Sequence, residues 1–327
     1  MSHISTPFRS VISGCGHYLP DNVITNEELS KTVDTSHQWI VERTGIHQRQ
    51  FALEGQLTSD LAFEASKRAL EKAGVDAKEL DLIVVATATP DVTFPSTGTR
   101  LQAKLGNITG LAFDVAAVCA GYLLALNVAD NFLKLGQSKT ALVVGAETLS
   151  RLLDMQDRRT CVLFGDGAGA VVLKAVPSDQ TDRGVIGIHM QSDGNFHDIL
   201  YADGGVSSTG TRGKVYMEGR EVFRHAVTKL AASAEKTLCD YKIDPEDLDW
   251  LIPHQANLRI IEGMAKKLNM SMEKVITTVQ HHANTSAASI PLALSHAVEK
   301  GQVKEGDLIL HEAIGGGLVW GSGLVRF

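Results

Sequence analysis

Residues 79–88 read ELDLIVVATA and residues 247–253 read DLDWLIP, so an acidic turn leads into a short apolar run twice in this chain. Such an uninterrupted apolar run is typical of a strand buried on both faces of a parallel sheet. Before the first run, residues 59–73 carry apolar side chains at a helical period, and Gly74 ends that segment. Helices that alternate with buried strands predict a layered α/β fold.

The two runs are separated by 248 − 80 = 168 residues, and this offset recurs. The string LAL occurs at 124–126 and again at 292–294, and the predicted strand 140–147 has an apolar counterpart at 308–310. A repeat of this length indicates a duplicated domain and not a solenoid. Between these elements, residues 162–173 are expected to form two strand pieces around a glycine turn.

The repeat divides the chain into two predicted halves, residues 1–175 and residues 176–327. They are expected to meet in the segment AVPSDQTDRG, residues 175–184, which is polar and rich in turn-forming residues. The candidate nucleophile described below lies in the first half, and its candidate polar partners lie in the second.

Composition narrows the classes of protein that this chain can be. Of 327 residues, 44% are apolar and 21% are charged, which is typical of a folded protein with a large core. Lys and Arg number 31 against 38 Asp and Glu, so the net charge of −7 excludes a generally basic nucleic-acid binder. There is no secretory signal, and no apolar stretch is long enough to span a bilayer. The sequence predicts a cytoplasmic protein without a membrane or nucleic-acid partner.

The four cysteines, Cys15, Cys119, Cys161 and Cys239, form no CxxC pair, which fits neither a zinc ribbon nor a dense disulfide framework. Cys119 lies in DVAAVCAGYLLAL, at the start of a predicted apolar helix. The N-terminus of a helix directs N–H groups and partial positive charge at the sulfur and favours the thiolate. Cys119 is therefore a candidate nucleophile, although a lone cysteine is more often a small buried hydrophobe.

Two polar candidates stand in the second half. His254 follows the predicted strand 247–253, and ligand sites of open α/β sheets collect at the carboxyl ends of strands. Asn284 stands in HHANTSAASIP before a predicted helix. Both could instead cap the helices that follow them. The neighbouring His281 and His282 would point to opposite sides of an extended segment, so we expect no metal site.

Residues 315–317 are three glycines between two apolar runs. Glycines weaken a strand without adding packing, so they predict a tight loop at this point. Such a loop can present a backbone N–H to an oxyanion, and a plain β-turn is the alternative.

Taken together, these motifs resemble those of the β-ketoacyl-acyl-carrier-protein synthase III family of the thiolase superfamily. The resemblance covers nearly the whole chain and implies a thiolase-like fold, in which two duplicated α/β halves form a layered α-β-α-β-α sandwich. The motifs that carry it are TSHQWIVERTGI (35–46), FDVAAVCAGY (113–122), FGDGAGA (164–170), PHQANLRII (253–261), ANTSAASIP (283–291) and EAIGGGLVWGS (312–322).

The resemblance implies an acyltransferase that starts fatty-acid synthesis. Cys119 would be acylated by a short acyl-CoA such as acetyl-CoA, while the N–H groups of Cys119 and Gly316 hold the oxyanion. Malonyl-acyl-carrier protein would then lose CO2, with His254 and Asn284 donating hydrogen bonds to its thioester carbonyl oxygen. The carbanion equivalent would attack the acyl-cysteine and give a β-ketoacyl product. No cofactor is implied, because acyl-CoA is a substrate.

The resemblance also implies the residues that bind CoA. Trp39 and Arg158 would sandwich the adenine, an arrangement that suits a flat base. Arg220 stands where some family members carry Asn, and Ala283 stands where Gly is frequent, so that its methyl group would narrow the site slightly. The implied CoA contacts are Thr35, Trp39, Arg43, Arg158 and Asn257.

Two protein partners are implied. Arg259, Lys266 and Lys267 lie on or near one helix of an acidic protein, and this basic face would steer the acidic carrier protein. A merely solvated helix face is the alternative. Phe94 resembles a residue that crosses the dimer interface of the family to line the acyl pocket, which predicts a homodimer.

Three rival functions stay open at this point. A condensing or acyl-transfer enzyme of secondary metabolism would use the same Cys-His-Asn site. A cysteine hydrolase also uses Cys, His and Asn in that order, but here the local signature of papain-like proteases around the cysteine is missing. A catalytically silent protein that binds CoA thioesters would not need all three polar residues.

Overall fold

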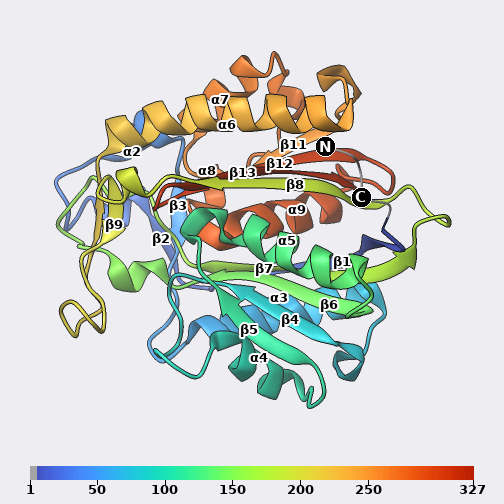
Figure 1. Cartoon of the computed structure of the whole chain (residues 1–327). Helices are drawn as coiled ribbons and strands as arrows, with labels where there is room; N and C mark the ends of the chain where they lie inside the picture. Colours follow the sequence, from blue (N-terminus) through green and yellow to red (C-terminus); the bar gives the residue numbers. More distant parts are fainter. Residues whose placement is uncertain (1–5) are drawn as a thin grey trace.

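The computed structural model describes residues 6–327, which form two sheets between three layers of helices (Figure 1). The predicted layered α-β-α-β-α sandwich is therefore confirmed. One outer layer contains α3 (Thr58–Ala73) and α4 (Thr97–Leu105), and the central layer contains α5 (Gly121–Lys134) and α9 (Ser289–Glu299). The other outer layer contains α6 (Gly219–Tyr241) and α7 (Leu258–Lys267).

The first sheet has five strands, in the order β1 (Phe8–Tyr18), β7 (Gly167–Pro177), β6 (Thr140–Glu147), β4 (Leu82–Ala86) and β5 (Leu111–Val115). The second sheet has four, in the order β8 (Gly184–Ser192), β13 (Val319–Arg326), β12 (Leu308–Gly315) and β11 (Trp250–Pro253). In the first sheet β4 pairs in parallel with both β5 and β6, and in the second β11 pairs in parallel with β12; the other neighbouring strands of the two sheets are antiparallel. Every residue of β4 is buried, and so are Leu251, Ile252 and Pro253 of β11, as the two uninterrupted apolar runs predict.

The two sheets repeat one topology. The first residues of β4 and β11 are 250 − 82 = 168 positions apart, and the same offset separates α5 from α9 and β6 from β12. This correspondence supports the predicted duplication. β7 continues to Pro177, past the predicted boundary at residue 175, and the boundary itself stays a prediction.

Local signals explain why the predicted helix 59–73 forms. Asp60 accepts a hydrogen bond from the Leu57 backbone N–H at the N-terminus of α3, and Gly74 takes a left-handed φ of 60° at its C-terminus. The buried face of α3 packs on β1 and β7. The prediction of this helix is confirmed.

The prediction of two strand pieces within 162–173 is wrong for the first piece. Residues 161–163 form a turn, and only β7 is a strand in this range. The Leu163 carbonyl accepts from the Asn284 N–H, and the Gly165 N–H donates to the Asn284 carbonyl, each at 2.9 Å. The apolar run is buried because it contacts the second half of the chain, and not because it belongs to a sheet.

Shorter elements complete the fold around this framework. They are the strand pairs β2 (Val23–Thr25) with β3 (Gln48–Gln50) and β9 (Leu200–Ala202) with β10 (Val215–Met217), and the helices α1 (Asn26–Leu29), α2 (His37–Thr44) and α8 (Val279–His282). Across residues 6–327, no helix has both the length and the apolar character needed to cross a bilayer. The four cysteines are free thiols.

Candidate active site

Cys119 lies in a short 3-10 turn, Val118–Ala120, that leads directly into α5. The predicted position at the start of an apolar helix is therefore confirmed. Its side chain is buried, with 4% of its surface exposed. Val118 holds a φ of 46°, which is unusual for a β-branched residue and is a strain found mostly at functional sites.

His254 follows β11, and its backbone N–H donates to the Glu312 carbonyl of β12 at 2.7 Å. The ring nitrogen Nδ1 lies 2.7 Å from the Ser289 hydroxyl. Burial lowers the pKa of His254 to about 3, because a buried imidazolium would lose its hydration. The imidazole is therefore neutral at neutral pH, as the implied mechanism requires.

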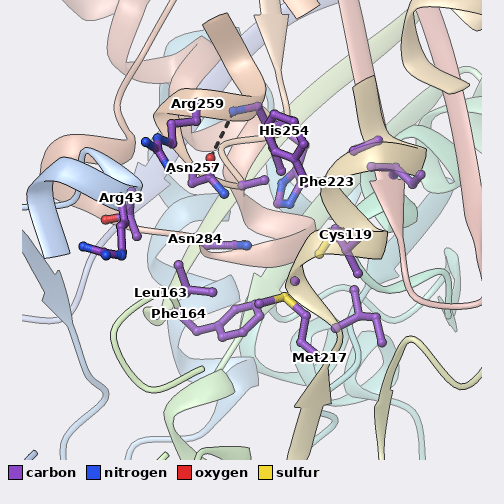
Figure 2. A pocket seen from close by; sticks show the side chains of 18 of the residues that line it. Arg43, Cys119, Leu163, Phe164, Met217, Phe223, His254, Asn257, Arg259 and Asn284 are labelled. Carbon is purple, nitrogen blue, oxygen red and sulfur yellow. Dashed lines mark hydrogen bonds between the residues drawn. The ribbon is translucent and has the colours of Figure 1, made fainter. Parts of the chain in front are cut away.

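Asn284 is held by its backbone against residues 163–165, so the first half of the chain fixes a residue of the second. Its Oδ1 accepts a hydrogen bond from the Ser286 backbone N–H at 2.9 Å. In Figure 2 the amide of Asn284 and the sulfur of Cys119 point into the same cavity. Asn284 therefore does more than cap a helix.

Cys119, His254 and Asn284 line one cavity of about 650 Å³ (Figure 2). This volume lies in the usual range of small-molecule sites. Other parts of the wall are apolar and include Leu163, Phe164, Leu200 and Met217. The sequence predicts most of the polar residues of the cavity, with Thr44 not identified and Arg220 left open. It does not identify these apolar residues, because nothing in their spacing relates them to Cys119.

The helix N-terminus favours the thiolate of Cys119, but burial opposes it. Burial raises the pKa of Cys119 to about 12, although a hydrogen bond with Ser286 acts in the opposite direction. The resting side chain is therefore a thiol. The thiol proton must therefore leave as the sulfur attacks.

Two of the predicted CoA residues line the cavity, and Trp39 contacts one of these two and Arg158. Arg43 and Asn257 line the cavity, and so does Arg220, whose contact the sequence leaves open. The Arg43 guanidinium lies 4.4 Å from the Trp39 ring centroid, and that of Arg158 lies 5.1 Å from it. These contacts make a flat, cationic surface beside the entrance, which suits a nucleotide.

Other predicted residues do not line the cavity. Thr35 lies just before α2, and its Oγ1 is buried without a hydrogen-bond partner. Lys266 and Lys267 are exposed at the last turn of α7, whereas Arg259, in its first turn, lines the cavity. Phe94 is 83% exposed and does not reach the cavity of its own chain.

The glycine turn approaches Cys119 through Gly315. A Cβ on Gly315 would lie 2.7 Å from the Cys119 backbone nitrogen, so only glycine permits this contact. A Cβ on Gly316 would instead lie 2.6 Å from the Leu200 carbonyl oxygen. Gly315 therefore lies against the Cys119 backbone, and the role of the Gly316 N–H stays a prediction.

Ala283 explains why glycine is frequent at its position. Its φ of 56° and ψ of −161° fall in a region that essentially only glycine adopts without strain. Ala283 does not line the cavity, so the expectation that its methyl group narrows the site is wrong. Ser286, at φ 50°, is a second strained residue close to Asn284.

Comparisons with known proteins identify the family of this chain. The 3-oxoacyl-[acyl-carrier-protein (ACP)] synthase III model matches residues 113–194, and the model of the C-terminal part of that enzyme matches residues 238–327. Beta-ketoacyl-[acyl-carrier-protein] synthase III of Paramagnetospirillum magneticum is 59% identical, over 97% of this chain and 99% of its own.

Solved structures give the same result. The 3-oxoacyl-[acyl-carrier-protein] synthase III of Aquifex aeolicus is 45% identical with a TM-score of 0.93, over 97% of this chain and 100% of its own. The priming β-ketosynthase of the R1128 polyketide pathway is 33% identical with a TM-score of 0.92, over 99% and 98%. From its sequence, its fold and its cavity, this chain belongs to the β-ketoacyl-acyl-carrier-protein synthase III family of condensing enzymes.

Proposed function

We propose that this chain starts fatty-acid synthesis by joining a short acyl-CoA to malonyl-acyl-carrier protein, with Cys119, His254 and Asn284 as its catalytic residues. One observation carries the assignment of these residues: a cysteine of one half and two neutral hydrogen-bonding side chains of the other line a single cavity. The proposed reaction needs no cofactor besides its two substrates.

In the first half-reaction, the Cys119 sulfur attacks the thioester carbonyl of acyl-CoA. A sulfur–carbon bond forms, and the bond to the CoA sulfur then breaks, so that CoA leaves as a thiol with the proton that Cys119 gives up. The backbone N–H groups of Cys119 and Gly316 are proposed to hold the intermediate oxyanion. The close approach of Gly315 to the Cys119 nitrogen supports this role of the turn.

In the second half-reaction, the bond between the α-carbon and the carboxylate of the malonyl group breaks and releases CO2. Its electron pair becomes an enolate, whose oxygen accepts hydrogen bonds from His254 and Asn284. The enolate carbon attacks the acyl group, and the bond to Cys119 breaks to regenerate its thiol. No base has to remove an α-proton, because decarboxylation supplies the carbanion equivalent.

We propose the residues that contact the two substrates from the opposite charges of those residues and of the substrates. The cationic surface of Trp39, Arg43 and Arg158 would bind the adenine nucleotide of CoA, with Thr35 and Asn257 along the same path. Arg259, with Lys266 and Lys267 on the same helix, would attract the acidic carrier protein.

The homodimer and the cytoplasmic location also belong to the proposal. Phe94 is a large apolar side chain with 83% of its surface exposed, which supports a role at an interface with a second copy. In that arrangement it would complete the acyl pocket of the partner.

The likeness to the R1128 priming β-ketosynthase supports one alternative, the priming of a secondary-metabolite pathway. The higher identity to β-ketoacyl-acyl-carrier-protein synthases III favours fatty-acid synthesis. A panel of acyl-CoAs mixed with malonyl carrier protein, with products identified by mass spectrometry, tests the proposal. We expect a carrier protein that bears a short β-ketoacyl chain. Exclusive use of an unusual acyl-CoA as the primer would favour the secondary-metabolite pathway.

The nucleophile is tested separately. Cys119→Ser is expected to form no acyl-enzyme with acyl-CoA, because a buried serine hydroxyl is a much weaker nucleophile than the cysteine sulfur. Intact-protein mass spectrometry detects the added acyl group. An acyl-enzyme that persists in this variant, with the fold intact by circular dichroism, would contradict the role of Cys119.

A further inference from the structure

The hydroxyl group of Ser289 contacts His254, and Ser289 is not among the residues that line the cavity. Ser289 is the first residue of α9 and is 2% exposed. Its Oγ lies 2.7 Å from the Nδ1 atom of His254 and accepts the Gln255 backbone N–H at 3.3 Å. The hydroxyl therefore contacts the same imidazole that lines the cavity.

The direction of the hydrogen bond between Ser289 and His254 follows from a count of protons. The hydroxyl has a single proton, and its oxygen already accepts from Gln255. Throughout residues 6–327, the structure offers this proton no acceptor other than Nδ1 of His254. Nδ1 therefore accepts, and a neutral imidazole whose Nδ1 accepts carries its own proton on Nε2.

The segment 286–289 also donates a hydrogen bond to the side chain of Asn284. Its Oδ1 accepts the Ser286 N–H, and among residues 6–327 its amide N–H groups have no hydrogen-bond partner, which leaves them for the cavity. Residues 286 and 289 thus supply one donor each to the acceptor atoms of the two side chains. What remains directed at the cavity is a pair of neutral donors.

We propose that Ser289 is a positioning residue, which fixes the His254 tautomer with the proton on Nε2 so that His254 donates to the substrate oxygen. This inference rests on the roles proposed above for His254 and Asn284. Without the Ser289 hydroxyl, Nδ1 and the Gln255 N–H would both lack a partner in a buried site. The imidazole could then rotate or place its proton on Nδ1, and Nε2 would no longer donate.

The proposal predicts that the two half-reactions respond differently. Donation by His254 is needed when the enolate oxygen becomes charged, and not when Cys119 attacks acyl-CoA. Ser289→Ala should therefore lower the rate of condensation with malonyl carrier protein about 10-fold, the effect of losing one buried hydrogen bond. Formation of the acyl-enzyme should keep its wild-type rate.

Helix α9 provides a matched control. Ser295 lies on the same helix, is 1% exposed, and its hydroxyl lies 2.9 Å from Nδ1 of His17, away from the cavity. Ser295→Ala removes the same kind of serine–histidine contact from the same helix. It should leave both half-reactions unchanged, so a general loosening of α9 would be recognised.

The tautomer can be measured without turnover. In the full-length protein labelled with ¹⁵N-histidine, long-range correlation spectra distinguish a protonated ring nitrogen from an unprotonated one, and the His254 signals are those lost in His254→Asn. Wild type and Ser289→Thr, which keeps the hydroxyl, should have an unprotonated Nδ1. Ser289→Thr should also recover most of the condensation rate lost in Ser289→Ala.

Three results would overturn the proposal: a protonated Nδ1 on His254 in the wild-type protein, equal losses of acylation and condensation in Ser289→Ala, or the same loss in Ser295→Ala. Melting temperatures of all variants separate unfolding from a change in the site. Failure of the wild-type protein to form any β-ketoacyl product would overturn the proposed function instead, and the spectrum would still decide the tautomer.

Discussion

Exchange of Asn284 for aspartate should separate the two half-reactions most clearly. Asn284→Asp keeps the shape of the side chain and an oxygen to accept the Ser286 N–H. The backbone hydrogen bonds of residue 284 to Leu163 and Gly165 are unaffected. The change replaces an N–H donor by an acceptor at the point where the enolate oxygen gains charge. Loss of one such donor costs about 3 kcal/mol of transition-state stabilisation, or a rate about 10²- to 10³-fold lower.

Single-turnover experiments measure this effect. Enzyme acylated beforehand with acyl-CoA is mixed with malonyl carrier protein, and CO2 and the β-ketoacyl product are followed over time. Condensation should fall by the stated factor, while acylation of Cys119 by acyl-CoA changes less than condensation. The reasoning is refuted if acylation falls as far as condensation, or if Asn284→Asp condenses at the wild-type rate.

Three further changes test other parts of the molecule. Arg259→Glu should raise the KM for malonyl carrier protein more than that for acyl-CoA, because it reverses a charge beside the entrance, and equal changes would contradict the docking face. Arg158→Ala should raise the KM for acyl-CoA about 2- to 5-fold, the value of an exposed cation–π contact, and an unchanged KM would argue against the adenine site. Burial lowers the pKa of His311 to about 4, whereas an unfolded histidine has a pKa of about 6.5. As the pH falls below about 6.5, His311 is therefore protonated in the unfolded chain but not in the folded one. The wild-type protein should lose about 2 kcal/mol of unfolding free energy through this group between pH 7 and pH 5. His311→Phe should lack that loss in denaturant titrations at the two pH values, whereas the neighbouring Tyr122→Phe should keep it, and an identical pH dependence in His311→Phe would contradict the assignment.

Elements that satisfy a single periodicity could be predicted from the sequence. β4, β6 and α3 are each specified by a run of residues whose burial follows one rule, and their observed bounds lie close to the predicted ones. The segment 162–164 is different. It is as apolar as a strand, but its backbone pairs with Asn284, far away along the chain, and no local pattern contains that partner.

In the candidate site too, some residues can be predicted from local sequence, and others depend on contacts between distant segments. Cys119, His254 and Asn284 belong to sequence motifs, so the sequence alone predicts that these three side chains lie in one site. Ser289 stands in the same motif as Asn284, yet its contact with His254 depends on how α9 packs beside β11. A serine near the start of a helix reads as an ordinary cap in the sequence, and only the packing of two separate elements gives it a partner.

The burial of the cavity also bears on the choice between a condensing enzyme and a cysteine hydrolase. Burial raises the pKa of Cys119 to about 12 and lowers that of His254 to about 3, because in each case it penalises the charged form. Burial therefore opposes both members of a thiolate–imidazolium pair, on which papain-like hydrolases rely. Neutral donors suit an enolate oxygen better, since they stabilise a charge that appears only after CO2 has left and leave the ground state unaffected. The low polarity of the cavity thus opposes hydrolase chemistry and favours decarboxylative condensation through one and the same effect.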